Sequence, residues 1–287
     1  MSALTILADL VHRRSGLVLG PDKLYLMEAR LGGLMRREAI PDLASLAHRL
    51  QTERNEALEQ DVVEAMATHE TLFFRDQKPF EHLRNTGLPT LLRNRGPGAR
   101  LRMWSAAAST GQEAYSIAMM IAESGLIERH RVEIVGTDLA RGPIARARAG
   151  LYTQYEVQRG LSVHNLLEHF TRQGEEWQIN RPIRSMCSFR EWNLLDDIAP
   201  LGKFDVVFCR NVLFYFDVPT KAKVLAAIRR QMAPDGLLYL GSAETTMGLD
   251  DALERDGPSH ALHANAPRAA TGHKHSTLPP RTPTYQS

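Results

Sequence analysis

The first 68 residues carry the pattern of an all-helical segment. Apolar side chains recur at spacings of three and four residues in four successive stretches, at Leu4–Val11, Leu24–Met35, Leu43–Leu50 and Leu58–Met66. This spacing places the apolar side chains of each stretch on one face of a helix. We therefore predict a small N-terminal helical module without strands.

After residue 95 the pattern changes to short apolar stretches that alternate with helical ones. The predicted strands are Leu101–Ala107, Val132–Thr137, Phe204–Cys209 and Leu237–Ser242, and the predicted helices span 111–123, 140–149 and 219–232. The run at 204–209 is nearly continuously apolar, which is typical of a strand buried on both faces. This alternation predicts an α/β fold, in which helices cover a parallel sheet through right-handed crossovers.

Residues 160 to 195 interrupt the alternation. A helix is predicted at Val163–Phe170, followed by short strands at Trp177–Ile179 and Ile183–Trp192 that are joined by a turn at 180–182 (Asn-Arg-Pro). We interpret this stretch as a small antiparallel sheet inserted into the α/β domain.

These patterns divide the chain into two domains and a tail. We assign residues 1–75 to a helical domain with its linker and residues 76–265 to the α/β domain, with the inserted β-subdomain at about 160–192. Residues 266–287 contain four prolines and almost no large apolar residues, which predicts a disordered tail.

The composition narrows the possible functions. Of the 287 residues, 43% are hydrophobic and 24% are charged, as in ordinary globular proteins, and a formal net charge of +2 gives no reason to expect nucleic-acid binding. No stretch approaches the roughly 18–20 apolar residues of a membrane span, and the N-terminus lacks a signal-peptide pattern, so we expect a cytoplasmic protein. Cys187 and Cys209 fit no metal-binding spacing, so no metal is expected; the sequence leaves a disulfide between them open.

The loop after the first predicted strand is a candidate ligand site. It reads WSAAASTGQE from Trp104 to Glu113, and its small side chains let a ligand approach the backbone. Ligands of open α/β sheets bind beyond the carboxyl ends of the strands. The loop lacks the three glycines of the dinucleotide fingerprint, which disfavours a nicotinamide oxidoreductase and favours a ligand without a pyrophosphate, such as an adenosyl sulfonium.

Two acidic residues near this loop admit two interpretations each. Asp138 follows the second predicted strand, where a carboxylate accepts hydrogen bonds from ribose hydroxyls, but it could equally cap the helix that begins at residue 140. The small-residue loop one strand earlier favours the ribose role. Glu113, taken alone, is best explained as a solvated charge in the first turn of a helix.

Three segments together resemble the chemotaxis receptor methyltransferases, the CheR family. They are THETLFFR at 68–75, WSAAASTGQEAYSIA at 104–118 and FDVVFCRNVLFYFD at 204–217, and the similarity runs from about residue 5 to residue 265. The resemblance implies a Rossmann-like methyltransferase with a small all-α N-terminal domain and an inserted antiparallel β-subdomain. It also implies methyl transfer from S-adenosyl-L-methionine to glutamate carboxylates of bacterial chemoreceptors, with S-adenosyl-L-homocysteine as product.

The resemblance also assigns site residues. The implied cofactor-binding residues are His69, Thr71, Arg75, Ala107, Glu113, Asp138, Asn193, Leu194, Arg210 and Asn211. Among them, Asp138 would hold the ribose, while Asn193 and Leu194 would flank the adenine. His69 departs from the family, which often has asparagine at this position.

The predicted catalytic residues are Arg75 and Tyr215. The side chain of a glutamate ordinarily has a pKa of about 4.3 and is already ionised at neutral pH, so the reaction requires no general base. The guanidinium of Arg75 matches a carboxylate in a planar fork, either that of the substrate or that of the cofactor. Tyr215 would lie beside the reacting group, although its spacing alone suggests a core aromatic residue between Phe214 and Phe216.

A basic helix is the candidate docking surface. Lys23, Arg30, Arg36 and Arg37 lie on one predicted helix, and the resemblance favours docking to acidic receptor helices over an ordinary solvated face. Some family members clamp a peptide at the receptor C-terminus with a longer, glycine-richer loop in the inserted sheet. The compact turn at 180–182 predicts that this protein works without that tether, and we expect a monomer.

Two rival functions remain compatible with these residues. One is a methyltransferase that acts on a different carboxylate, which the basic helix mildly disfavours if the acceptor is a small molecule. The other is a non-catalytic adapter that binds the cofactor as a signal, which the presence of Arg75, Arg210, Asn211 and Tyr215 disfavours.

Overall fold

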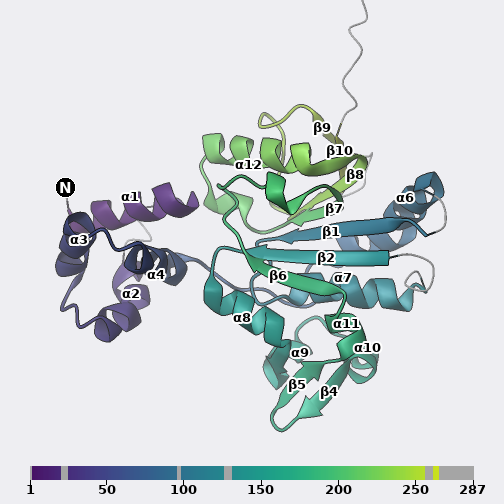
Figure 1. Cartoon of the computed structure of the whole chain (residues 1–287), viewed down its shortest axis with the longest axis horizontal. Coiled ribbons are helices and arrows are strands. Elements are labelled where there is room, and N and C mark those ends of the chain that lie inside the picture. Colours follow the sequence, from purple (N-terminus) through teal and green to yellow (C-terminus); the bar gives the residue numbers. More distant parts are fainter. Residues whose placement is uncertain (1, 21–24, 96–97, 126–130, 256–260, 265–287) are drawn as a thin grey trace, which may run out of the picture.

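The computed structural model describes residues 2–20, 25–95, 98–125, 131–255 and 261–264. Lys23 and the predicted tail at 266–287 lie outside these ranges. The chain forms a small helical domain and a larger α/β domain, which lie side by side in Figure 1. No helix in the described part of the chain has the length and apolar character needed to cross a bilayer.

The described part of the helical domain contains four helices, as the sequence predicts. They are α1 (Ala3–Ser15), α2 (Leu26–Arg37), α3 (Leu43–Thr52) and α4 (Glu56–Met66). The side chains of Ser2, Asp42 and Asn55 cap α1, α3 and α4 by accepting a backbone N–H three residues later. The apolar faces of the four helices meet in one core. Gly16 ends α1 in the left-handed conformation, and a Cβ there would lie 2.9 Å from the side chain of Thr220, so glycine permits close contact between the domains.

The α/β domain is built on a seven-stranded sheet with the strand order β6-β2-β1-β7-β8-β10-β9. The strands are β1 (Arg100–Ala106), β2 (Arg131–Asp138), β6 (Cys187–Glu191), β7 (Phe204–Cys209), β8 (Met232–Leu240), β9 (Leu253–Arg255) and β10 (Ala261–Ala264). The first five are parallel, and β10 runs antiparallel to both β8 and β9. Strand order reverses between β1 and β7, which marks the carboxyl edge at that point as the expected ligand crevice.

Helices cover both faces of this sheet (Figure 1). One face packs against α7 (Gln112–Glu123), α5 (Lys78–His82), the π-helical turn η2 (Leu83–Gly87) and α6 (Leu88–Arg95), and the other packs against α12 (Val218–Gln231). Val206 and Phe208 point into the first core, while Val207 and Cys209 point into the second. The apolar run of β7 is therefore buried on both faces, as predicted. The helices at 78–95 were not predicted.

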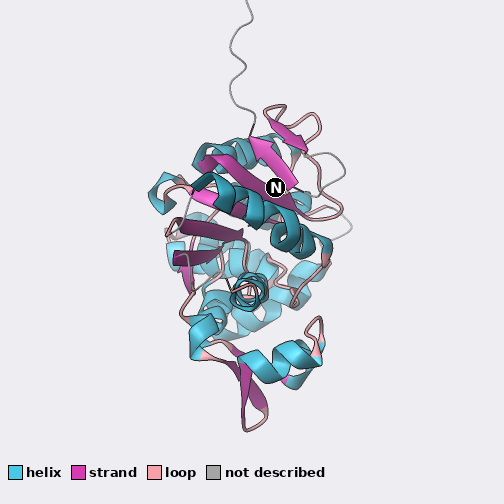
Figure 2. Ribbon diagram, turned by 90° about the vertical axis from the view of Figure 1, so that its right-hand side faces the viewer, coloured by secondary structure: helices cyan, strands magenta, loops and turns pink. Residues whose placement is uncertain are grey.

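The insertion contains a small antiparallel sheet, but its strands differ from those predicted. The sheet has the order β3-β5-β4, with β3 at Leu151–Thr153, β4 at Phe170–Gln173 and β5 at Glu176–Ile179, and it lies apart from the main sheet at the bottom of Figure 2. The helices α9 (Gln154–Gln158) and α10 (Val163–His169) pack against it, whereas α8 (Arg141–Ala149) packs against β2 and β6 of the main sheet. Because β3 belongs to this sheet, the sheet begins before the predicted span of 160–192.

The predicted pairing of 177–179 with 183–192 is wrong. Residues Arg181–Arg184 form a short helix, α11, with Pro182 in its first turn, where proline is tolerated. The following strand, β6, joins the main sheet beside β2, where the ring of Phe189 packs on Gly136. The hairpin turn of the small sheet lies instead at 174–175, where Gly174 has a positive φ of 62°.

Cys187 and Cys209 do not form the disulfide that the sequence left open, because both are free thiols.

Candidate functional site

A cleft opens at the carboxyl edge of the main sheet, where the helical domain meets the α/β domain. Its empty volume is about 940 Å³, open solvent at its mouth included. The residues that line it include every predicted cofactor-binding and catalytic residue: His69, Thr71, Arg75, Ala107, Glu113, Asp138, Asn193, Leu194, Arg210, Asn211 and Tyr215. The fold therefore brings together side chains that lie up to about 150 residues apart, in the crevice that the strand order marks.

The loop between β1 and α7 forms one wall of the cleft. Ala107 and Ser109 have positive φ angles of 60° and 51°. Two hydrogen bonds stabilise this unusual backbone. The N–H of Ala108 donates to the carbonyl of Thr137 at 2.8 Å, and the hydroxyl of Ser109 donates to the carbonyl of His69 at 2.7 Å. Gly111 opens α7 with a φ of 95°, and a Cβ there would lie 2.9 Å from the Cβ of Ala147. The loop is thus fixed to β2, to α8 and to the linker.

Asp138 ends β2 with its carboxylate buried in the cleft wall. Oδ2 accepts the N–H of Ser109 at 2.8 Å and Oδ1 accepts the N–H of Ala140 at 3.0 Å. The helix cap of α8 is Ala140, without a side-chain bond, so Asp138 is not the N-cap. Burial raises the pKa of Asp138, while the two amides and the imidazole of His69, 4.0 Å away, oppose this shift. The arrangement fixes an acceptor at the position expected for ribose binding.

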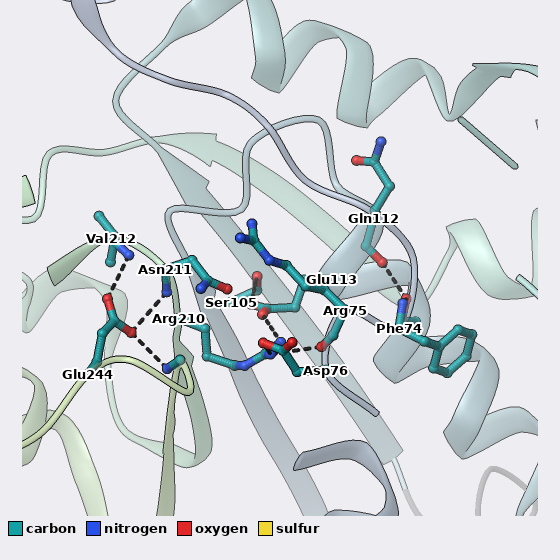
Figure 3. Close-up of polar contacts among 12 residues, drawn as sticks. Phe74, Arg75, Asp76, Ser105, Gln112, Glu113, Arg210, Asn211, Val212 and Glu244 are labelled. Atoms are coloured by element: carbon teal, nitrogen blue, oxygen red, sulfur yellow. Dashed lines mark hydrogen bonds and ion pairs between the residues drawn. The ribbon is translucent and has the colours of Figure 1, made fainter. Parts of the chain in front are cut away.

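Glu113 is not a solvated helix charge, because it belongs to a buried network. Its carboxylate accepts the hydroxyl of Ser105 at 2.7 Å and Nη1 of Arg210 at 3.1 Å. Nη2 of Arg210 donates to Oδ2 of Asp76 at 2.9 Å and to the carbonyl of Arg75 at 2.7 Å (Figure 3). The side chain of Arg210 is 1% exposed. Burial raises the pKa of Glu113, and the guanidinium of Arg210 opposes that shift. Two carboxylates thus balance the charge of Arg210.

Arg75 differs from Arg210 in having no ion pair among the described residues, although its charge helps to lower the pKa of Glu70, which pairs with Arg159. Among these residues its guanidinium donates to the carbonyl of Glu70, at 3.3 Å, and in Figure 3 it points away from Arg210 and Asp76. The backbone on both sides of it is left-handed, with φ angles of 48° at Phe74 and 53° at Asp76. This tight turn holds the guanidinium of Arg75 in the cleft lining, where its positive charge is available to an anionic ligand.

The turn after β7 carries Asn211 and Tyr215. Asn211 has a φ of 60°, and the 3₁₀ helix η5 (Leu213–Tyr215) follows it. Tyr215 is half-buried and lines the cleft, whereas Phe216 is buried, so Tyr215 is not a core aromatic residue. The N–H of Val18 donates to the carbonyl of Tyr215 at 2.8 Å. The helical domain therefore contacts the turn directly.

Asn193 and Leu194 lie in the opposite wall, directly after β6 and Trp192. The amide nitrogen of Asn193 donates to the carbonyl of Arg14 at the end of α1, while its oxygen accepts the N–H of Leu195 at 3.0 Å. Leu194 is 9% exposed and forms part of the core. Asn193 therefore joins the two domains at the rim of the cleft, a role that the sequence does not reveal.

The basic residues of α2 do not form one free face. Nη1 of Arg30 donates to the carbonyl of Met66 at 2.5 Å and Nη2 donates to the hydroxyl of Thr68 at 3.1 Å. Arg37 pairs with Asp61 on α4. The side chain of Arg36 is exposed and takes part in no hydrogen bond or ion pair within the described ranges. The seven-residue spacing thus places Arg30 and Arg37 toward α4, and docking through these residues stays a prediction.

The sequence did not predict three polar residues that support the site. Ser105 and Asp76 belong to the network of Glu113 and Arg210, and Glu244 binds the backbone of the turn at 211–213. Asp76 could have been suspected because it directly follows Arg75, and Ser105 because it lies in the stretch WSAAASTGQE, eight residues before its partner Glu113. Glu244 has no local signal, because the turn that it binds lies about 30 residues earlier.

Comparisons with known proteins agree with this geometry. The sequence pattern of the CheR methyltransferase SAM binding domain matches residues 69–259, and that of the CheR methyltransferase all-alpha domain matches residues 2–67. The chain is 43% identical to "Chemotaxis protein methyltransferase Cher2" of Pseudomonas putida over 84% of its own length and 89% of that protein. It is 44% identical to "Chemotaxis protein methyltransferase 1" of Pseudomonas aeruginosa, with the same coverage. A relative from Vibrio parahaemolyticus, "Chemotaxis protein methyltransferase", is 38% identical over 85% of this chain and 89% of that protein.

Proposed function

Because this chain belongs to the CheR methyltransferase family, we propose that it methylates glutamate side chains of bacterial chemoreceptors with S-adenosyl-L-methionine. The products are glutamate methyl esters and S-adenosyl-L-homocysteine. This assigns the protein to adaptation in chemotaxis, as a protein-glutamate O-methyltransferase.

The cleft fits the methyl donor. Asp138 provides a fixed carboxylate for the ribose hydroxyls, the small-residue loop from Ala107 leaves room at the end of β1, and Asn193 and Leu194 line the wall assigned to the adenine. When bound, the donor supplies an electrophilic methyl group on a sulfonium. We assign His69, Thr71, Glu113, Arg210 and Asn211 to the same site because they line the same cleft.

The single observation that best supports a carboxylate as the methyl acceptor is the contrast between Arg75 and Arg210. Arg210 is buried and balanced by Glu113 and Asp76, so it has little charge to offer a ligand. Arg75 has no such partner within the described residues and lines the cleft. A guanidinium binds a carboxylate through two parallel hydrogen bonds, which also fixes its orientation.

Positioning accounts for catalysis at such a site. A glutamate is already ionised at neutral pH, so Arg75 needs only to orient it, and the hydroxyl of Tyr215 can donate a hydrogen bond to it. Alignment of two reactants in one cleft can lower the barrier by about 7–11 kcal/mol.

We infer a specific mode of partner binding. The acceptor lies on cytoplasmic helices of the receptor, and exposed Arg36 contributes to their docking. The hairpin between β4 and β5 has only the two residues 174–175 in its turn, which supports binding without a C-terminal peptide tether. We further propose that the protein acts in the cytoplasm as a monomer, without nucleic acid and without membrane insertion. Titration with receptor C-terminal peptides tests the tether proposal, which micromolar or tighter binding would overturn.

The experiment that tests the activity is methyl transfer from tritiated S-adenosyl-L-methionine to membranes rich in chemoreceptors. The label should be released by base as a volatile product, as expected of a methyl ester. Matched controls are membranes without chemoreceptors and receptors in which alanine replaces the methylated glutamates. Label that persists in either control identifies a different acceptor. No transfer, with S-adenosyl-L-homocysteine binding intact by calorimetry, supports the adapter function instead and overturns the proposal.

A further inference from the structure

Glu244, in the segment after β8, is a buried carboxylate whose hydrogen bonds, within the described residues, all come from backbone amides. Oε1 accepts the N–H groups of Val212 at 2.9 Å and Leu213 at 2.7 Å. Oε2 accepts the N–H groups of Asn211 at 2.9 Å and Gly241 at 2.7 Å. Glu244 is 8% exposed and does not belong to the lining of the cleft. In Figure 3 Asn211 lies between Glu244 and Arg75.

Three of the four amides belong to consecutive residues of the turn that carries Asn211 and Tyr215 into the cleft. Asn211 adopts a left-handed conformation, which asparagine tolerates better than most residues but which is still less favourable than the right-handed one and needs support from its surroundings. Three successive N–H groups that point to one side also have no partner in a helix or sheet. A single carboxylate with two oxygens satisfies all three and thereby selects this conformation.

Gly241 allows the carboxylate to come this close. A Cβ at this position would lie 2.7 Å from Oε2 of Glu244 and 2.9 Å from Nδ2, the side-chain amide nitrogen of Asn211. Any other residue at 241 would therefore displace the carboxylate or the side chain of Asn211. Gly241 and Glu244 together connect the end of β8 to the turn after β7.

We propose that Glu244 is a positioning residue for methyl transfer: by binding the amides of 211–213, its carboxylate holds Asn211 and Tyr215 in place in the cleft. The inference rests on the proposed function, because it gives Asn211 and Tyr215 roles in cofactor binding and methyl transfer. Glu244 itself touches neither ligand.

The test is Glu244→Gln, which keeps the size of the side chain but replaces one acceptor oxygen by an NH₂ donor. In either orientation this NH₂ faces two backbone N–H donors, so one pair of hydrogen bonds is lost. We expect kcat to fall about 10- to 100-fold and the Kd for S-adenosyl-L-homocysteine to rise about 3- to 10-fold. Calorimetry with the product needs no acceptor, so it tests the proposal even if chemoreceptors prove to be the wrong substrate.

A double variant separates positioning from a general loss of stability. If Glu244 acts through Tyr215, the variant Glu244→Gln with Tyr215→Phe should lose little more kcat than the worse single variant, whereas additive losses would contradict the proposal. Should Glu244→Gln fail to fold, Gly241→Ala displaces the intact carboxylate and should lower kcat in the same way.

The matched control is Asp205→Asn. Asp205 is also 8% exposed and also accepts a backbone N–H, that of Arg102 at 2.7 Å, but it lies at the amino end of β7, far from the cleft. This variant should lower Tm while kcat and the product Kd stay within twofold of wild type. If Glu244→Gln behaves like Asp205→Asn, with only Tm changed, Glu244 is a structural residue and the proposal is wrong.

Discussion

The two ends of the main sheet both hold arginine–carboxylate networks, yet only one end is a site. At the amino end, Arg95 bridges Asp205 and Asp235, and Arg102 pairs with Glu133. Every charge of these two networks has a partner within the protein. Arg131, which begins β2 at the same end, has no ion pair among the described residues, but it is exposed to solvent. Within the described ranges this end therefore offers a ligand no buried charge that lacks a partner.

At the carboxyl end the pairing is incomplete. Arg210 is balanced, but Arg75 forms no ion pair in the described part of the chain, and Asp138 lines the cleft. The comparison teaches that buried charge alone does not identify a binding site. A charge left uncompensated beside a cavity does, because the protein has fixed it there at a cost that a ligand can offset.

The largest expected contrast is between Arg75→Ala and Arg95→Ala. Loss of the guanidinium at 75 removes a charge-assisted hydrogen bond to a ligand carboxylate, so kcat/KM for receptor methylation should fall about 10- to 100-fold with Tm nearly unchanged. Loss of Arg95 leaves Asp205 without its cation and should lower Tm while kcat/KM is retained. Steady-state kinetics and thermal unfolding of both variants check this. A collapse of kcat/KM in the Arg95 variant would erase the distinction between the two ends.

The kinetics of the Arg75 variant also separate its two possible ligands. If Arg75 binds the carboxylate of the methyl donor, the Kd for S-adenosyl-L-homocysteine should rise with the loss of activity. If it binds the target glutamate, that Kd should stay unchanged while KM for the receptor rises or kcat falls.

A second contrast concerns pH. If Asp138 binds the ribose hydroxyls as we propose, its ionised form accepts both of their hydrogen bonds, whereas protonation removes the negative charge and turns one oxygen into a donor. Because burial raises the pKa of Asp138 above its usual value, product affinity should be lost as pH falls toward that raised pKa, at a higher pH than an ordinary aspartate would require. Asp138→Asn should weaken the product Kd about tenfold at neutral pH and remove this pH dependence. Calorimetric measurement of the product Kd across pH checks this prediction. In the control variant His69→Asn, the affinity for the product should still decrease as pH falls.

Sequence patterns predicted the parts of the fold that depend on local periodicity. The bounds of β7 match the apolar run at 204–209, and the four N-terminal helices match their apolar faces. The strand at 187–191 was placed in the wrong sheet, because its partner is decided by the contact of Phe189 with Gly136, about 50 residues away. The pattern there is too short to specify a partner.

The site shows the same limit. The resemblance named the residues that line the cleft, because motifs record side chains. It missed Glu244, whose partners are backbone amides that any residue provides, and it could not show that Arg30 is used inside the protein. Pairing between side chain and distant backbone leaves no pattern along the chain.

A smaller contrast compares Asp76→Asn with Asp235→Asn. Both side chains are partly exposed, at 42% and 36%, and each is one of two carboxylates that bind a single arginine. Because Arg210 also holds the backbone of Arg75, Asp76→Asn should lower kcat/KM about two- to fivefold, within the range of a solvent-screened pair. Asp235→Asn should leave kcat/KM unchanged. If Asp76→Asn and Asp235→Asn change kcat/KM equally, then the position of a carboxylate at the carboxyl or the amino end of the sheet does not determine its effect on activity.

The smallest expected effect tests docking on α2. Arg36 is exposed, so Arg36→Ala should raise KM for receptor membranes about two- to threefold and reduce the loss of activity with added salt, because a rim charge acts mainly through screened attraction. Arg30 donates to the backbone carbonyl of Met66 and to the hydroxyl of Thr68 on the way to the cleft, so Arg30→Ala should lower Tm instead. Kinetics at low and high ionic strength distinguish the two. If Arg30→Ala changes the salt dependence and Arg36→Ala does not, then Arg30 leaves its partners to bind the receptor, and the contacts of α2 with the linker belong to the free protein only.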